Sequence, residues 1–194
     1  MHRFARLGLL VSVFAFGLLL GFVQPSSAYI IYTPADKELN GSGMLTVDFN
    51  RDGILDASIQ QSSRFDGNNC WLDLVQAYPG TRGAIVATDQ GGFAWASALT
   101  AGYIIGSQAP LNFGEALMLD VHSGSCSLDD GYWGDGAVHY LGVAFKIRGA
   151  LHFGWIQLKV TYANNHFGHE LTTTLTGYAY ETVAGRPIVA GRTS

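Results

Sequence analysis

Short apolar runs, separated by glycine-rich breaks, recur from Trp71 onward and restrict the kind of fold that this chain can adopt. The runs are residues 71–75, 84–87, 93–96 and 103–105. Their spacing of roughly ten residues is typical of short strands joined by tight turns, and each run is too short for a core helix. No internal repeat and no linker divides the sequence. We therefore predict one all-β domain over residues 29–194, with the architecture of a jelly-roll-like antiparallel β-sandwich.

The C-terminal third has the clearest strand pattern. Residues 139–147 and 152–160 form two strand-like runs around a short turn at residues 148–150. In the second run, apolar and polar residues alternate, as expected for a strand with one buried face. Residues 171–180 form a further long run. We predict a hairpin followed by a third long strand.

The N-terminus has the features of an export signal. Arg3 and Arg6 precede an almost unbroken apolar run over residues 7–23, and Ser26 and Ala28 are the small residues that signal cleavage requires. The alternative is a membrane anchor, for which the run is short. We predict a signal helix over residues 1–28, its removal, and a secreted or periplasmic protein with no stable membrane anchor.

The composition of the remaining residues limits the possible partners. Cleavage after Ala28 removes two of the 11 basic residues and none of the 15 acidic ones, so 9 basic and 15 acidic residues remain, with a formal charge of −6. An acidic chain without basic clusters is not expected to bind nucleic acid or an anionic membrane.

The two cysteines, Cys70 and Cys126, both follow the predicted signal. A single pair in an oxidising compartment most simply forms one disulfide. The alternative, a nucleophilic cysteine, is at odds with the predicted export. We predict a Cys70–Cys126 disulfide.

The most concentrated group of oxygen-bearing side chains lies in one short segment. Its members are Asp48, Asn50, Asp52 and Asp56. Alternate residues of a tightly turning loop direct their oxygens towards one point, and Gly53 permits the sharp turn. Ca²⁺ takes about six to eight such oxygens. We predict a Ca²⁺ site formed by these four side chains and the backbone carbonyl of Ile54, whose side chain is expected to pack in the core.

The same spacing matches the first half of an EF-hand loop, but its twelfth position is Ile59, which cannot supply a bidentate carboxylate. The flanking segments, 44–47 and 57–60, have strand character. The loop therefore resembles the Asp-x-Asn-x-Asp-Gly-x-x-Asp calcium turns of FG-GAP repeats. The alternative is an ordinary polar turn, since Asn, Asp and Gly favour turns, but that alternative does not explain Asp48 and Asp56.

A second polar loop follows Cys126 and combines carboxylates with aromatic rings. Its candidate ligand-binding residues are Asp129, Asp130, Tyr132, Trp133 and Asp135. The three carboxylates are candidates for another cation site, and exposed rings beside carboxylates suit the binding of sugars. The alternative is a solvated loop in which Asp and Gly serve only as turn residues.

Several short motifs resemble the C-terminal regions of exported bacterial proteins of the PEP-CTERM kind. They are Tyr140-Leu141-Gly142, His152-Phe153-Gly154-Trp155-Ile156, Gly177-Tyr178-Ala179-Tyr180-Glu181 and Pro187-Ile188. An early Asp-x-Asn-x-Asp-Gly turn is common in that group as well. The resemblance implies an exported all-β sandwich and no particular activity. The chain ends without the Pro-Glu-Pro sorting signal, so anchoring by that route is not expected.

Known catalytic motifs are missing from the sequence. It contains no Gly-x-Ser-x-Gly elbow, no His-Glu-x-x-His and no phosphate-binding loop. We therefore expect a non-catalytic module with a structural or adhesive role at or outside the cell surface. The alternatives are a carbohydrate-binding module, with an extracellular polysaccharide or surface component as partner, and an extracellular glycan hydrolase.

Overall fold

The computed structural model describes residues 29–165 and 168–194, and the predicted signal at residues 1–28 lies outside the described part. All the secondary-structure elements of the described residues are β-strands, which confirms the all-β prediction. The strands are β1 (Ile30–Asn40), β2 (Gly43–Val47), β3 (Ala57–Phe65), β4 (Cys70–Pro79), β5 (Ala84–Gln90), β6 (Phe93–Ala96), β7 (Ile104–Ile105), β8 (Leu111–Asn112), β9 (Ala116–Gly124), β10 (Leu128–Gly131), β11 (Asp135–Ile147), β12 (Ala150–Asn165), β13 (Gly168–Glu181) and β14 (Ile188–Val189).

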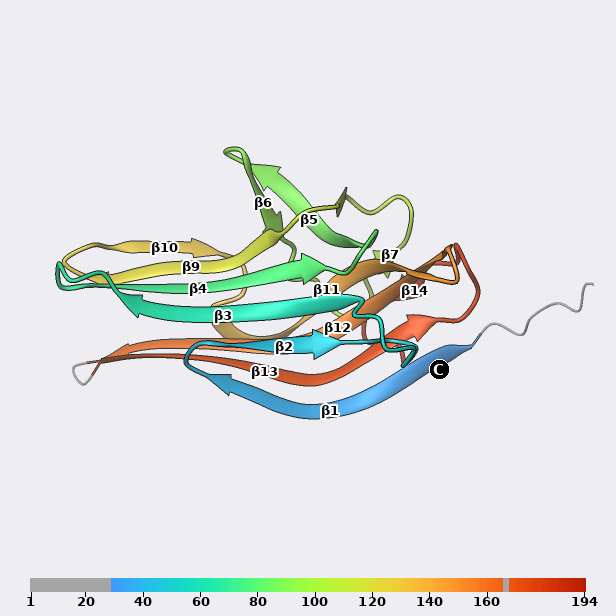
Figure 1. Cartoon of the computed structure of the whole chain (residues 1–194), viewed down its shortest axis with the longest axis horizontal. Helices are drawn as coiled ribbons and strands as arrows, with labels where there is room; N and C mark the ends of the chain where they lie inside the picture. The colour runs from blue at the N-terminus through green and yellow to red at the C-terminus, as the bar shows by residue number, and fades with distance from the viewer. Residues whose placement is uncertain (1–28, 166–167) are drawn as a thin grey trace, which may run out of the picture.

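Twelve of these strands belong to one sheet. Its path runs β1-β13-β12-β11-β5-β6-β9-β4-β3-β2, with β10 attached to β9 and β8 attached to β5. In Figure 1 the strands β10, β9, β4, β3 and β2 follow one another from top to bottom, β13 and β1 lie below them, and the β5–β6 hairpin stands out at the top. The strands at the two ends of the path, β1 and β2, are separated in the chain by Gly41 and Ser42 alone, so the path nearly closes. The finer prediction of a jelly-roll-like sandwich stays a prediction.

The hairpin predicted in the C-terminal third is confirmed as β11 and β12. Its turn consists of Arg148 and Gly149, which both have positive φ, at 50° and 85°. Two left-handed residues give a two-residue turn whose twist matches that of the flanking strands. This turn sets the pairing of Ile147 with Ala150 and with it the register of the whole hairpin.

The core lies between the two parts of the sheet. Ile59 on β3 and Val75 on β4 face Ile156 on β12, and all three side chains are fully buried. The rings of Phe49 and Phe145 stack in this core at a centroid distance of 4.5 Å. Full burial of an apolar side chain of this size stabilises the fold by about 1.5–3 kcal/mol.

A buried glutamine connects the two ends of the sheet path. Gln61 on β3 is 1 % exposed, and its Nε2 donates hydrogen bonds to the carbonyls of Gly41 at 2.7 Å and Leu171 at 2.8 Å. Its Oε1 accepts a hydrogen bond of 2.7 Å from the hydroxyl of Thr173 on β13. Because a buried amide is costly without partners, this set of bonds fixes β3 against β13.

The predicted disulfide is confirmed. Cys70 at the start of β4 is bonded to Cys126 in the loop after β9, with a Cα–Cα distance of 5.5 Å. The two residues are 56 positions apart, so the bond closes a long loop that contains the antiparallel neighbours β4 and β9.

Candidate functional site

The predicted calcium loop joins β2 to β3 at the end of the molecule that lies on the right in Figure 1. Its two ends are held together by the pairing of Val47 with Ala57 and by a hydrogen bond of 2.9 Å from the Asp56 N–H to the Val47 carbonyl. The loop is therefore a closed hairpin connection on a rigid base, and its shape is set by side chains within it.

Asp48 caps the turn. One carboxylate oxygen accepts the backbone N–H of Asp52 at 3.2 Å, and the other accepts that of Gly53 at 2.8 Å. Gly53 has a φ of +86°, the left-handed conformation that the sequence led us to expect at the sharp turn. Asp48 thus folds residues 48–53 into a compact ring of hydrogen bonds.

Asp52 lies at the exposed side of this ring. It accepts hydrogen bonds of 2.8 Å from the side-chain amide of Asn50 and of 2.9 Å from the backbone N–H of Ile54. These bonds, the Asn50 bond foremost, hold the pKa of Asp52 below its usual value because they favour the ionised carboxylate.

Asp56 has a different environment, because its side chain is 5 % exposed at the edge of the core. Burial raises the pKa of Asp56 to about 6, and the charges of Asp48 and Asp52 act in the same direction, against a hydrogen bond of 2.8 Å from the Phe49 N–H. The backbone carbonyl of Asp56 accepts the N–H of Gly80 at 2.7 Å, which ties the loop to the β4–β5 turn. A buried carboxylate beside two others is a place where positive charge is favoured.

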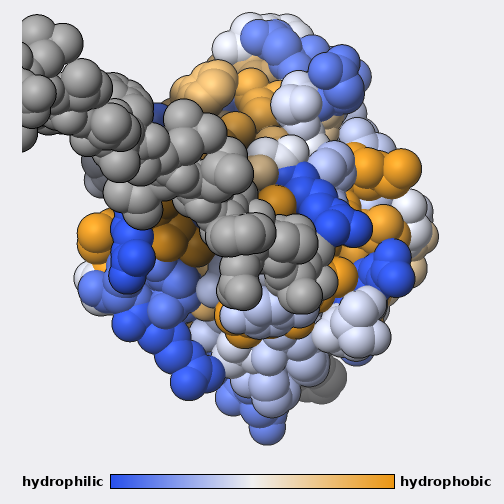
Figure 2. All heavy atoms as spheres, turned by 90° about the vertical axis from the view of Figure 1, so that its right-hand side faces the viewer, coloured by the Kyte–Doolittle hydropathy of each residue, from blue (hydrophilic) through white to orange (hydrophobic). Residues whose placement is uncertain are grey.

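The expected packing of Ile54 in the core is wrong. Its side chain is 59 % exposed, and that of Leu55 is 49 % exposed. The backbone N–H of Ile54 bonds Asp52, and this turn directs the Ile54 side chain outward. Figure 2, which views this end of the molecule, shows separate hydrophobic patches set among hydrophilic residues.

The donor chemistry of the loop fits calcium, which prefers hard oxygen ligands. Asp48, Asn50, Asp52 and Asp56 together supply three carboxylates and an amide within nine residues. In the described residues, however, no three acidic, histidine or cysteine side chains are gathered closely enough to hold a metal ion. Backbone N–H groups take one lone pair of most carboxylate oxygens in the loop, and each oxygen keeps a second. Cation binding therefore requires the carboxylates to converge further.

The second polar loop differs from its prediction at Trp133. That residue was expected to be exposed, but it is fully buried, and its indole N–H donates to the Ala96 carbonyl at 2.9 Å. Burial of the large apolar ring is favourable, and the hydrogen bond removes the cost of burying its only polar atom. Tyr132 is 45 % exposed, with its hydroxyl on the Gln90 side chain at 2.9 Å. Only one of the two rings is thus available at the surface.

The three carboxylates of this loop are not brought together. Asp129 and Asp130 are neighbours on β10, so their side chains point to opposite faces. Asp135 bonds the Nε2 of His139 at 2.9 Å, and this bond lowers the pKa of Asp135. Asp130 pairs with Asp120 across β9 and β10, which places both carboxylates on the outer face of the sheet.

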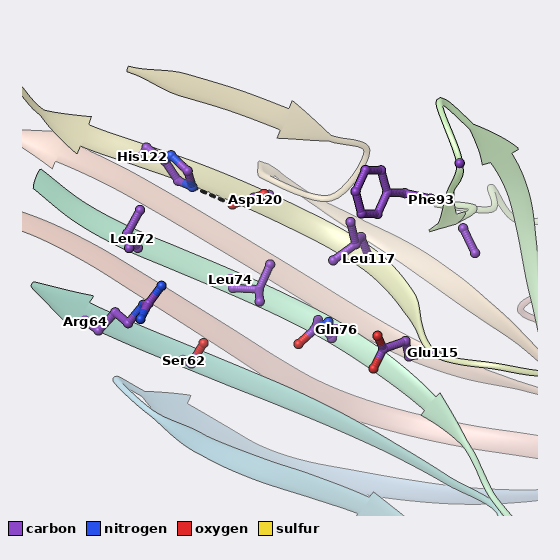
Figure 3. Close-up of a pocket in the computed structure, with 12 residues that line it drawn as sticks. Ser62, Arg64, Leu72, Leu74, Gln76, Phe93, Glu115, Leu117, Asp120 and His122 are labelled. Carbon is purple, nitrogen blue, oxygen red and sulfur yellow. Dashed lines mark ion pairs between the residues drawn. The ribbon is translucent and has the colours of Figure 1, made fainter. Parts of the chain in front are cut away.

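That outer face carries a hollow of about 620 Å³. Figure 3 shows Leu72 and Leu74 of β4 at its base, between side chains of β3 and β9, with Phe93 opposite Leu117. We call this hollow the β4 groove. Its polar lining residues are Ser62, Arg64, Gln76, Glu115, Asp120 and His122.

Strand register arranges the groove in cross-strand rows. Arg64 pairs with Leu72, which in turn pairs with His122. In the next row Ser62 pairs with Leu74, and Leu74 with Asp120. His122 and Asp120 form an ion pair at 3.0 Å. Leu72 and Leu74 on β4 thus each have a polar side chain on the neighbouring strand at either side.

The β4 groove was not predicted from the sequence. The available signal was Leu72 and Leu74, which alternate with the buried residues Asp73 and Val75 and so occupy the outward face of a strand. Apolar residues at outward positions indicate a surface that is covered or used for binding. The run 71–75 is apolar on both faces, so the sequence alone did not separate the two sides.

Comparisons with known proteins found nothing that matches this chain, whether among protein-family models, curated proteins or solved structures. Among residues 29–165 and 168–194, we find no helix with the length and apolar character needed to span a membrane.

Proposed function

We propose that this chain is an exported, non-catalytic β-sandwich module that calcium stabilises and that has a structural or adhesive role at or outside the cell surface. The observation that carries the proposal is the buried carboxylate of Asp56 beside Asp48 and Asp52, in a loop whose ends are held by β2 and β3. Without a cation this charge is unfavourable at neutral pH, and a divalent ion reverses that penalty.

The cation would be held by the side chains of Asp48, Asn50, Asp52 and Asp56 and by the backbone carbonyl of Ile54. When bound, Ca²⁺ supplies positive charge that neutralises the loop. Since binding favours the folded state alone, it adds stability in proportion to the logarithm of the calcium concentration. The folded module is therefore more stable where calcium is abundant, as it is outside cells.

Export is supported by the signal-like residues 1–28 and by the disulfide, which suits an oxidising compartment. Mass spectrometry of the protein recovered from an exporting host tests this part of the proposal. We expect a mature chain that begins at Tyr29. A chain that retains residues 1–28 would contradict it.

A non-catalytic role is supported by the placement of the carboxylates in the β4 groove. Glu115 and Asp120 are five positions apart along one extended segment, which corresponds to roughly 16–17 Å of backbone. Asp130 is the cross-strand partner of Asp120, so these two carboxylates lie next to each other on one face of the sheet and not on either side of a sugar. Glycosidases use carboxyl pairs about 5–10 Å apart on either side of the sugar. We therefore favour binding over hydrolysis.

Isothermal titration with CaCl₂ at pH 7.5 tests the calcium proposal. We expect one binding site in the native chain, no measurable binding in Asp52→Ala, and unchanged binding in Asp36→Ala, an exposed carboxylate of β1 outside the loop. Absence of binding in the native chain, or equal binding in Asp52→Ala, would contradict it.

The second candidate function, a carbohydrate-binding module, is favoured by the exposed ring of Tyr132, although the burial of Trp133 removes the ring expected beside it. Substitution of Tyr132 by Ala, rather than of the core residue Trp133, tests the contribution of this loop. We expect weaker retention on polysaccharide, and unchanged retention would exclude the loop as the sugar site.

A further inference from the structure

We propose that the β4 groove binds a neutral polysaccharide chain, with Phe93 as the ring against which a sugar stacks. This inference rests on the proposed adhesive role and assigns to it a surface and a ligand class. This surface, the outer face of β3, β4 and β9, is separate from the candidate sugar loop at residues 129–135.

The base of the groove provides apolar contact. Leu72, Leu74 and Leu117 are half-buried and face outward from the sheet, and Phe93 at the tip of the β5–β6 hairpin is 62 % exposed. Pyranose rings have an apolar face of C–H groups, which packs on aliphatic side chains and aromatic rings. A groove of about 620 Å³ lies within the usual range for small-ligand sites.

The rim provides hydrogen bonds of both kinds. Arg64 donates, Asp120 and Glu115 accept, and Ser62 both donates and accepts. The Oε1 of Gln76 accepts the hydroxyl of Tyr78 at 3.0 Å, which directs the donor end of the amide away from Tyr78. Sugar hydroxyls are donors and acceptors at once, so they match this mixed rim.

The charges of the groove argue against an anionic ligand. The carboxylates of Asp120 and Glu115 outnumber the one guanidinium, that of Arg64, and the Nε2 of His122 already lies 3.0 Å from Asp120. An anionic polymer requires a cluster of cations, because its affinity comes from charge neutralisation. The rim therefore disfavours an anionic chain, and its mixed donors and acceptors suit a neutral one.

The geometry also argues against an extended peptide and against a second copy of this chain. Peptides that add to sheets need a free strand edge, whereas the base strand β4 is hydrogen-bonded on both sides, to β3 and β9. Stable protein interfaces bury about 800 Å² on each partner over a complementary surface. A hollow beside the protruding ring of Phe93 does not offer a flat face.

The length of the groove indicates an oligomeric ligand. Three cross-strand rows pass through Leu72, Leu74 and Gln76, which are spaced two residues apart along β4 and together span about 14 Å. This is the length of a short stretch of polysaccharide rather than of one sugar. Asp130, opposite Asp120 on β10, extends the second row by one strand.

Affinity electrophoresis of the disulfide-bonded protein tests the proposal, with hydroxyethylcellulose, galactomannan, xylan and laminarin as neutral probes and alginate as the anionic probe. We expect retardation by at least one neutral polysaccharide, and at least tenfold weaker binding in Phe93→Ala. Phe113→Ala is the matched control, since Phe113 is 75 % exposed outside the groove. Because both rings are exposed, neither substitution is expected to unfold the protein.

Three results would overturn the inference. They are no retardation by any neutral probe, retardation that Phe93→Ala leaves unchanged, and retardation by alginate alone that salt abolishes. Sedimentation of the same proteins checks for a dimer that Phe93→Ala dissociates, which would assign the groove to self-association instead. A protein that binds calcium in titration but no polysaccharide would refute this inference and leave the calcium proposal standing.

Discussion

The carboxylate of Asp56 accepts a hydrogen bond of 2.8 Å from the backbone N–H of Phe49, whose ring stacks on Phe145 in the core. The ionisation of one loop residue is therefore linked to the packing of the domain. Because Asp48 and Asp52 raise the pKa of Asp56 further, whatever neutralises this loop also stabilises the core beneath it.

The first prediction concerns the pH dependence of stability without calcium. The pKa of Asp56 is about 6 in the folded chain and 3.8 in its reference state, so the folded state binds more protons between these values. The free energy of unfolding should therefore fall as pH rises from about 4 to about 6 and then level off, by roughly 2–3 kcal/mol in all. Asp56→Asn should remove this fall and be more stable than the native chain at pH 7.5. Urea unfolding of calcium-free protein across this range measures both.

The control for that series is Asp36→Asn, at an exposed position of β1. Its pH profile should follow that of the native chain. A native profile without the fall, or an Asp56→Asn variant less stable at pH 7.5, would show that Asp56 is not the group responsible.

The second prediction concerns the close approach of Gly80 to the loop. A Cβ at Gly80 would lie 2.1 Å from the Leu55 carbonyl oxygen and 2.8 Å from the Asp56 Cα, both of them backbone atoms. Gly80→Ala should therefore push the loop away from the β4–β5 turn and cost on the order of 2 kcal/mol or more. Thermal unfolding measures the loss.

Gly114→Ala is the matched control, since a Cβ there meets nothing nearer than the Asn112 amide at 3.8 Å. Equal midpoints for the two alanine variants would mean that the loop and the turn are not packed as described.

The third prediction concerns the buried link at Gln61. Gln61→Leu removes the donor to the Gly41 and Leu171 carbonyls and leaves the Thr173 hydroxyl without its acceptor, at a cost of about 2–3 kcal/mol. Adding Thr173→Val to the same chain should recover part of the lost stability, because it removes the hydroxyl that no longer has an acceptor. A double-mutant cycle by chemical unfolding measures the coupling, and strictly additive effects would contradict it.

Much of the secondary structure was predictable from local pattern. Residues 93–96 form β6 as predicted, and 139–147 and 152–160 lie within β11 and β12, because short alternating runs and an Arg-Gly turn specify a strand and its reversal locally. The path of the sheet was not predictable. The parallel contact of β6 with β9 and the pairing of Leu74 with Asp120 join segments far apart in sequence, and no local signal selects them.

In the candidate sites too, the local features were predictable and the long-range contacts were not. Asp48 and Gly53 form the turn that their spacing predicts, because the bonds that shape it span only a few residues. Trp133 is buried where we expected an exposed ring, and Ile54 is exposed where we expected a core residue. The burial of such side chains depends on which distant strand lies beside them. For Trp133 the deciding partner is Ala96, 37 residues away.

Thermal unfolding of the oxidised protein at pH 7.5, with excess Ca²⁺ and with excess chelator, tests the central claim most directly. At a hundredfold excess over the dissociation constant, binding adds about 2.7 kcal/mol, which raises the midpoint of a domain of this size by about 5–10 °C. We predict a shift of that order that Asp52→Ala abolishes and Asp36→Ala retains. An unchanged midpoint in the native chain, or an equal shift in Asp52→Ala, would contradict calcium binding by residues 48–56.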